Sequence, residues 1–471
     1  MSGMLLQSIQ MIAAALRDGA VTSVELAQEA IDNHGRWGKA LGAYKCRMDD
    51  RFLAEARTAD AAFAAGLDFG PLQGIPVSVK DLYGVSGYQT FAGSPAALPE
   101  KWEREGPVVG ALRGSLAPIA GKTHTVEFAF GGVGTNAHWG TPRNPWDANA
   151  HRVPGGSSAG AGVTLCEGSA VLALGSDTAG SVRVPASFTG NVGVKTSFGR
   201  WSVEGIVPLS PSLDTAGVLA RNVPDAILAF AAIDPLTDVP GATLLAGLGE
   251  IDASEIHIGV CDYFFEGCDP GVAEGVKAAL DELAEAGARI TKIDLPEAAA
   301  ADEIFMKGGL AAPEFAAFIN GELAQSKTTL DPNVAARFES MEAITAVDYL
   351  LRCDRLRNLT ASFADRMAEV DVVVGPTVTI TPPTVEAVSD GDGYRTNNMA
   401  ALRNTRTGNM LALSAITIPV ALDKAGMPVG LQIMAPLDED ERVLAVALAF
   451  EGVLGDRTRR LGAPPMCQGQ A

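Results

Sequence analysis

The chain has 471 residues, of which 47% are hydrophobic and 20% charged, and this composition excludes an intrinsically disordered protein. Its formal net charge of −20 argues against a generic nucleic-acid binder, because an acidic surface repels phosphate groups. The length would allow about three domains, but no linker, internal repeat or low-complexity tail divides the chain. We therefore expect one folded unit over residues 1–471.

The cysteines and histidines give no sign of a metal centre. Six cysteines and five histidines are scattered along the chain, without a CxxC or HExxH pair. The N-terminal residues lack the basic region of a secretory signal, and no apolar run reaches the ~18 residues of a membrane span. We expect a cytoplasmic protein that needs no metal or cofactor and contacts neither membrane nor nucleic acid.

Residues 1–70 are predicted to be helical. Thr22-Ser23-Val24-Glu25 has the residues of a capping box, and an apolar 3.6-residue period follows it to about His34. A second helix is predicted over residues 49–66.

Residues 71–235 have a different sequence pattern, in which short apolar runs are joined by glycine-rich turns. Ile75–Val79, Ala117–Ala120 and Val171–Gly175 are predicted to be buried strands. The small residues of Ser157–Cys166 are predicted to form a helix. Nearly all motif-like sequence lies in this part, which we expect to be the core.

Residues 255–370 are predicted to form an embedded excursion of helices and strands, and residues 371–471 to return to the core sheet. The excursion begins with two strands, Ile256–Val260 and Arg289–Ile293, on either side of an amphipathic helix at Asp269–Ala286. The later predicted elements are a helix at Thr345–Met367, strands at Val370–Gly375, Ala415–Leu422 and Gly430–Met434, and a helix at Glu439–Leu454.

The segment Gly155–Pro185 combines small residues with many hydroxyls and contains no histidine. Acyl transfer needs a nucleophile, a base and donors for the developing oxyanion. Ser181 follows a run of small residues that would leave backbone N–H groups uncovered, as an oxyanion hole requires. Lys80 ends an apolar run and is the candidate base, because a desolvated lysine can be neutral near pH 7.

Other interpretations of these residues stay open at this point. A single lysine is usually a solvated surface group, and a Gly/Ser loop such as Gly155–Gly160 more often forms a turn or a phosphate cradle. His124 and His138 flank the same region, where each is interpreted as a pocket-lining or hydrogen-bonded side chain rather than an acid or base.

Seven motifs in order give the chain a specific resemblance to a known family. The motifs are GIPVSVKD at Gly74–Asp81, GKT at Gly121–Thr123, NPWD at Asn144–Asp147, GGSS at Gly155–Ser158, GSDTAGSVRVPA at Gly175–Ala186, PLSPSLDTAG at Pro208–Gly217 and PVGLQIM at Pro428–Met434. With these motifs the chain resembles the amidase signature family of serine hydrolases over nearly its whole length. The resemblance implies an α/β fold with a large mixed, mainly parallel central β-sheet covered on both faces by helices.

The resemblance also implies a role for each residue of a catalytic triad. Lys80 corresponds to the base, Ser157 to a bridging serine in a cis peptide, and Ser181 to the nucleophile that forms an acyl-enzyme. It further places Thr178, Ala179 and Gly180 in the oxyanion and substrate-binding loop, and Ser158, Asp177 and Arg183 in supporting positions.

Three positions depart from the family pattern. Ala159 and Ala179 stand where glycine is common, and Thr196 stands where proline is usual. Alanine fits most backbone conformations unless φ is positive, so we expect a retained oxyanion hole of slightly altered shape.

These observations favour an amidohydrolase that cleaves a C–N bond of a small or medium-sized linear amide. One alternative is the A subunit of a tRNA-dependent glutaminyl/asparaginyl amidotransferase, although those subunits carry GKTN-x-DEFAMG where this chain has GKTHTVEFAFG. A second is a small acyl-urea hydrolase of the allophanate or biuret type, since the alanine at position 179 resembles the allophanate hydrolase branch of the family. A third is a non-catalytic relative, against which the complete triad argues. A homodimer is left open.

Overall fold

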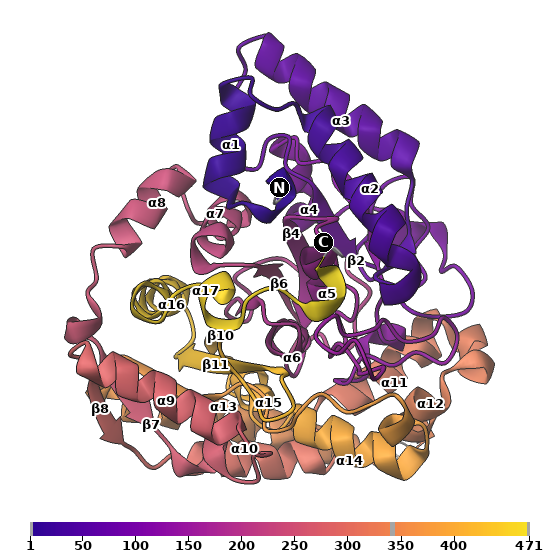
Figure 1. The fold of residues 1–471 in the computed structure, drawn as a ribbon. Coiled ribbons are helices and arrows are strands. Elements are labelled where there is room, and N and C mark those ends of the chain that lie inside the picture. Colours follow the sequence, from indigo (N-terminus) through magenta and orange to yellow (C-terminus); the bar gives the residue numbers. More distant parts are fainter. Residues whose placement is uncertain (1–2, 340–343, 469–471) are drawn as a thin grey trace.

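The computed structural model describes residues 3–339 and 344–468, and their strands form one 11-stranded sheet (Figure 1). Hydrogen-bonded neighbours follow the order β1-β3-β2-β4-β6-β5-β10-β11-β9-β7-β8. The strands are β1 (Tyr44–Cys46), β2 (Val77–Lys80), β3 (Ile119–Thr123), β4 (Leu172–Asp177), β5 (Val192–Lys195), β6 (Thr215–Ala220), β7 (His257–Val260), β8 (Arg289–Lys292), β9 (Val372–Pro376), β10 (Ser414–Leu422) and β11 (Pro428–Ala435).

The sheet is mixed and flanked by helices, as expected, but parallel pairing does not dominate it. Among the described strands, β2 pairs parallel with β3 and β4, and β7 with β8 and β9. The other six neighbouring pairs are antiparallel. β10 and β11 are antiparallel because only residues 423–427 join them, and a parallel pair would need a longer crossover. β5 and β6, which the sequence patterns did not reveal, lie antiparallel to each other and to their neighbours β10 and β4.

Helices cover both faces of the sheet. They are α1 (Ile9–Arg17), α2 (Ser23–Leu41), α3 (Asp49–Ala64), α4 (Pro107–Gly114), α5 (Ala161–Glu167), α6 (Arg183–Phe188), α7 (Val223–Ile233), α8 (Gly241–Leu248), α9 (Val272–Glu285), α10 (Pro296–Met306), α11 (Ala311–Glu322), α12 (Pro332–Glu339), α13 (Ala346–Arg366), α14 (Gly391–Ala401), α15 (Thr405–Met410), α16 (Asp440–Leu454) and α17 (Arg457–Leu461). Successive side chains of β4 point to opposite faces. Leu172 and Leu174 therefore pack in the main apolar cluster with residues of α7 and α16, whereas Ala173 packs with residues of α5 and α6.

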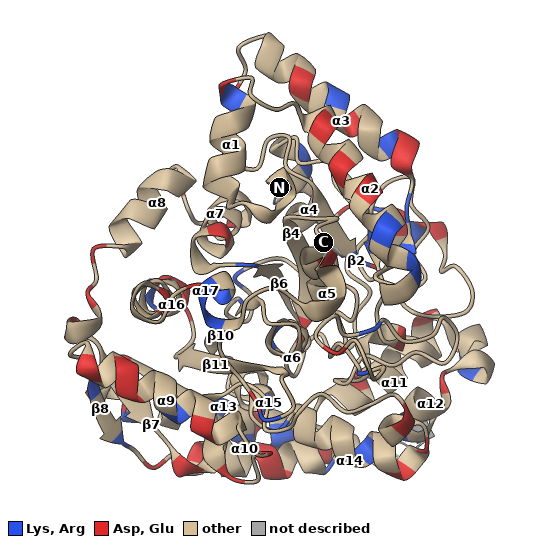
Figure 2. Cartoon of the chain, in the orientation of Figure 1, with Lys and Arg blue, Asp and Glu red and all other residues tan. Residues whose placement is uncertain are grey.

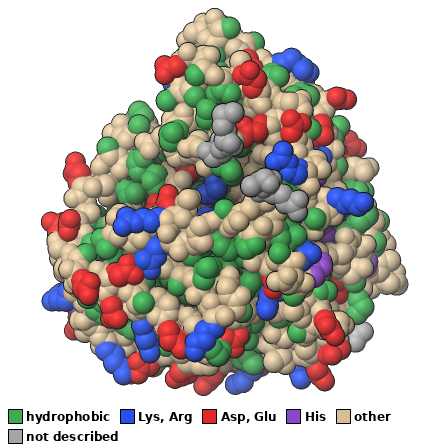
Figure 3. Space-filling model, viewed as in Figure 1, with side chains coloured by type: hydrophobic (Ala, Val, Ile, Leu, Met, Phe, Trp, Pro, Cys, Tyr) green, Lys and Arg blue, Asp and Glu red, His purple; other side chains and the backbone are tan. Residues whose placement is uncertain are grey.

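Charged residues concentrate on the outer helices, while the central strands carry few of them (Figure 2). On the face drawn in Figure 3, acidic and basic side chains are interspersed rather than gathered by sign. No helix in the described ranges is long and apolar enough to cross a membrane.

Two predicted helices illustrate where local sequence signals hold and where they fail. The capping box at Thr22 and Glu25 is present at the start of α2. In contrast, the helix predicted from Ser157 begins only at Ala161. A helix from Ser157 would need its carbonyl to accept the Ala161 N–H. That carbonyl instead accepts the Val126 N–H, and the Ala161 N–H donates to the Ser158 carbonyl.

Candidate active site

Lys80 is the last residue of β2 and lies fully buried between β3 and β4. Its Nζ lies 2.7 Å from the Oγ of Ser157 and 3.0 Å from the Oγ of Ser176, and it also donates to the Ser176 carbonyl at 3.3 Å. Within residues 3–339 and 344–468, no carboxylate lies within ion-pair distance of this ammonium. Burial lowers the pKa of Lys80 to about 7, although the charges of Asp177 and Asp214 act in the opposite direction.

Ser157 lies in a loop whose backbone is hydrogen-bonded to the segment after β3 and to the segment that carries Ser181. The Gly156–Ser157 peptide bond is cis, as the resemblance implied. The Ser157 carbonyl accepts hydrogen bonds from the Val126 N–H (3.1 Å) and the Thr125 hydroxyl (3.0 Å). The next residue, Ser158, donates its N–H to the Ser181 carbonyl at 3.3 Å. The structure thus places Ser157 against Lys80 and joins the backbone of the next residue, Ser158, to that of Ser181.

Asp177 ends β4 and organises the loop that carries Ser181. Its carboxylate accepts hydrogen bonds from the N–H groups of Gly180 (2.7 Å) and Val182 (3.0 Å). It also forms a fully buried ion pair with Arg183 at 2.9 Å. Burial alone would raise the pKa of Asp177, but the adjacent guanidinium outweighs it and holds that pKa well below its ordinary value. The carboxylate is therefore ionised and fixes the loop.

The loop differs from expectation at Gly180, because its N–H is engaged by Asp177 rather than left for an oxyanion. The N–H groups of Ala179 and Ser181 donate no hydrogen bond to any described part of the protein. Gly180 has φ of 130°, whereas Ala179 and Ala159 do not have positive φ. Alanine at the two departures from the family pattern is therefore unstrained, and Ala179 is the half-buried residue beside the nearly buried Ser181.

Sequence reasoning missed the side chains that brace this loop from distant segments. Thr178 donates its hydroxyl to Asp214 at 2.5 Å. Arg183 donates to Asn409 at 2.6 Å and to Gln432 at 2.7 Å. Asp214 and Gln432 lie in motifs that the sequence displayed, so their motif positions were the available signal.

Two histidines near the site have no side-chain hydrogen bond to Lys80, Ser157 or Ser181 in the described part of the chain. Burial lowers the pKa of His124 to about 4, which makes its ring neutral near pH 7. His138 contacts the buried carboxyl of Glu127 at 3.2 Å. Burial raises the pKa of Glu127 to about 8, and its second oxygen accepts the Asp331 N–H at 2.6 Å. These groups tie the residues before α12 to the segment after β3.

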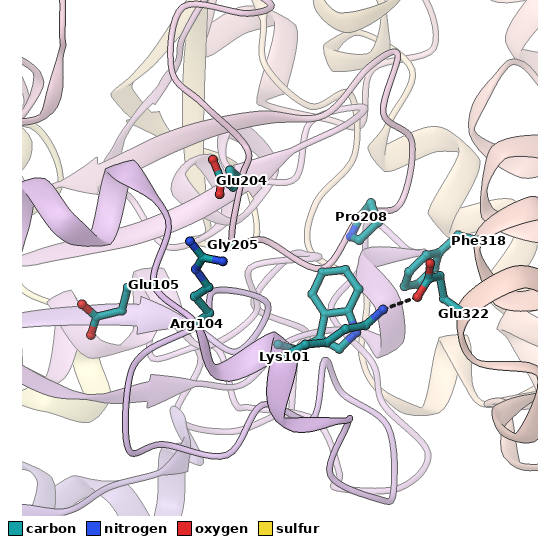
Figure 4. A pocket seen from close by; sticks show the side chains of 9 residues that line it. Lys101, Arg104, Glu105, Glu204, Gly205, Pro208, Phe318 and Glu322 are labelled. Carbon is teal, nitrogen blue, oxygen red and sulfur yellow. Dashed lines mark hydrogen bonds and ion pairs between the residues drawn. The ribbon is translucent and has the colours of Figure 1, made fainter.

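A pocket of about 380 Å³ lies apart from Ser157 and Ser181 (Figure 4). An ion pair between Lys101 and Glu322 crosses its rim, and Trp102 packs edge-on against Phe318. Lys80, Ser157 and Ser181 are not among the residues that line it. No group of three His, Cys, Asp or Glu side chains in the described ranges is arranged to hold a metal ion.

Comparison with known proteins identifies the family of this chain. The family described as Amidase matches residues 25–444. The chain is 48% identical over 455 residues to 2-amino-5-chloromuconic acid deaminase of Comamonas testosteroni, covering 96% of this chain and 97% of that protein. It is 32% identical over 459 residues to the glutamyl-tRNA(Gln) amidotransferase A subunit of Gloeobacter violaceus, covering 91% and 93% respectively. A crystal structure of an amidase, 30% identical, superposes with a TM-score of 0.85 over 95% of this chain and all of that one.

The chain therefore belongs to the amidase family. It is accordingly a hydrolase that acts on carbon–nitrogen bonds.

Proposed function

We propose that this hydrolase cleaves its substrate through an acyl-enzyme on Ser181, with Ser157 passing protons between Ser181 and Lys80. The observation that carries the proposal is the 2.7 Å hydrogen bond from Lys80 to Ser157. A buried lysine without a carboxylate partner can accept a proton near neutral pH, and its pKa of about 7 suits a general base.

The proposed cycle begins when Ser157 takes the Ser181 hydroxyl proton and passes its own proton to neutral Lys80. The Ser181 oxygen attacks the carbonyl carbon, and the N–H groups of Ala179 and Ser181 stabilise the resulting oxyanion. The proton then returns along the same path to the leaving nitrogen, which departs as the C–N bond breaks. Water hydrolyses the ester on Ser181 and regenerates the enzyme.

A fluorophosphonate probe tests this chemistry without knowledge of the substrate. We expect the native protein to be labelled and Ser181→Ala to remain unlabelled. Ser202→Ala removes an exposed serine outside the site and serves as the matched control. A native protein that takes up no probe would contradict the proposal and would favour a non-catalytic relative.

A second candidate concerns the substrate, and the 48% identity to a 2-amino-5-chloromuconic acid deaminase favours it. We propose that this chain releases ammonia from a small unsaturated amino diacid of the 2-aminomuconic type. In such a reaction water replaces the amino group, so the products are ammonia and a 2-oxo acid. The carbon attacked would be the imine carbon of the substrate tautomer rather than an amide carbonyl.

Measurement of ammonia release separates the candidates. The purified chain is given 2-aminomuconic acid, its 5-chloro derivative, a panel of primary amides, acyl ureas and glutamine. Primary amides as the best substrates would support the acyl-enzyme cycle, and the amino diacids as the best substrates would support the second candidate. Release from glutamine only after addition of a partner subunit would favour the A subunit of an amidotransferase. Acyl ureas as the best substrates would favour an allophanate-type hydrolase.

A further inference from the structure

Thr178 in the proposed oxyanion loop is tied to Asp214, a buried residue outside the triad. Its hydroxyl donates to Asp214 Oδ1 at 2.5 Å, and the two residues are 2% and 8% exposed. Thr178 directly follows β4, and Asp214 directly precedes β6, which pairs antiparallel with β4. The register joins Asp177 to Thr215, so the two segments leave the sheet side by side.

The second carboxylate oxygen of Asp214 closes the short loop that precedes Asp214 in the chain. It accepts the N–H groups of Leu209 and Ser210, each at 2.9 Å. One carboxylate therefore joins two segments: its Oδ1 holds Thr178 and its Oδ2 holds residues 209–214. Burial raises the pKa of Asp214 to about 6, so the carboxylate is ionised at neutral pH.

The loop 209–214 is itself fastened to the helical excursion. Glu314 on α11 accepts the Ser210 hydroxyl at 2.8 Å and the Ser212 N–H at 3.1 Å through one oxygen. Its other oxygen accepts the Tyr349 hydroxyl of α13 at 2.5 Å. Further along α11, Phe318 and Glu322 turn toward the pocket of Figure 4. A continuous series of hydrogen bonds therefore runs from α13 to the oxyanion loop.

We infer that Asp214 and Glu314 are positioning residues, through which the excursion of α11 and α13 sets the position of the oxyanion loop. This inference rests on the proposed function. The two carboxylates act through Thr178, whose displacement would move the neighbouring Ala179 N–H. Because an oxyanion forms only during reaction, misplacing its donors lowers kcat and leaves KM nearly unchanged.

The test compares Asp214→Asn and Glu314→Gln with Glu322→Gln. Glu322 lies on the same helix but pairs with Lys101 and does not reach the loop. We expect kcat to fall about 10²-fold in Asp214→Asn and about tenfold in Glu314→Gln, with KM changed less than about threefold. Glu322→Gln should keep the native kcat. The double variant should lose little more than Asp214→Asn alone, because the two residues act in one series.

A pH profile adds a readout that a purely structural role would not move. Asp177 and Asp214 are the charged groups that favour protonated Lys80. Removing the Asp214 charge should therefore shift the acid limb of kcat to lower pH. Losses that multiply in the double variant, or an unmoved acid limb together with a native kcat in Asp214→Asn, would overturn the inference.

Thr178 variants keep the inference testable if Asp214→Asn does not fold. Thr178→Val removes the hydroxyl and should reproduce the kcat loss, while Thr178→Ser should restore most of it. Equal kcat in these two variants would count against the inference. Failure of the native protein to react with fluorophosphonate would instead refute the proposed function, which separates the two outcomes.

Discussion

The Nζ of Lys80 and the Oγ of Ser157 lie 2.7 Å apart at the buried carboxyl end of β2. The geometry of this pair resembles that of a base and its proton donor rather than that of a structural ion pair, because no described carboxylate neutralises the lysine. By contrast, Lys122 on the neighbouring strand is also buried but pairs with Asp81 at 2.8 Å. Two buried lysines on adjacent strands thus have different partners, a hydroxyl for Lys80 and a carboxylate for Lys122.

The first prediction concerns pH. Because burial lowers the pKa of Lys80 to about 7, raising the pH through 7 converts it from the protonated to the neutral form. Activity should rise with it, and at pH 6 it should be about a tenth of the plateau or less, because the Asp214 carboxylate, whose pKa burial raises to about 6, is also partly protonated there. The measurement is kcat over pH 5–9 with the best substrate. An activity that is flat from pH 5 to 8 would exclude Lys80 as the base.

The second prediction assigns that ionisation to one of two lysines. Lys195 is also fully buried, and burial lowers its pKa to about 7, but it donates to the carbonyls of Thr196 and Leu413 rather than to Ser157. Lys80→Met should lower kcat by about 10²–10⁴-fold, the usual contribution of a general base. Lys195→Met should keep the acid limb and most of the kcat per folded molecule. The reverse pattern would show that the base had been assigned to the wrong lysine.

Much of the site could be predicted because its signals are local. The apolar run before Lys80 has the composition of a buried strand, and β2 ends at that residue. Ser181 could be singled out from the run of small residues before it, whereas Ser157 was identified only through the resemblance to the amidase signature family. The same local reasoning placed the start of α2 correctly through its capping box.

The bracing contacts could not be predicted because they depend on strand order. Thr178 meets Asp214, and Arg183 meets Gln432, only because β4, β6, β10 and β11 lie in one antiparallel region. An alternation of apolar and polar residues indicates a strand but does not indicate which strands lie beside it in the sheet. The helix predicted from Ser157 failed for a related reason, since the Ser157 carbonyl accepts the distant Val126 N–H instead of the Ala161 N–H.

The third prediction concerns stability of the loop scaffold. Arg183→Met leaves the buried Asp177 carboxylate without its ion-pair partner, which costs about 3–5 kcal/mol in the free energy of unfolding. The half-exposed pair of Arg442 and Asp371 gives the control, since Arg442→Met should cost about 0–1 kcal/mol. Urea denaturation at pH 7 measures both. The double variant Arg183→Met/Asp177→Asn should recover part of the loss, and equal costs for the two arginines would contradict this account.

The last prediction separates backbone strain from steric conflict in the oxyanion loop. Gly180 has φ of 130°, and a Cβ there would lie 2.1 Å from the hydroxyl oxygen of Thr405. Gly180→Ala should therefore push the loop away from α15 and lower kcat by at least about 10²-fold, as loss of an oxyanion donor does. Gly199 also has positive φ, of 82°, but its Cβ would meet nothing within 4 Å. Gly199→Ala should cost about 1 kcal/mol of stability and leave kcat unchanged. If Gly180→Ala kept more than half of the native kcat, the loop would be free to move and the close fit against Thr405 would have no part in catalysis.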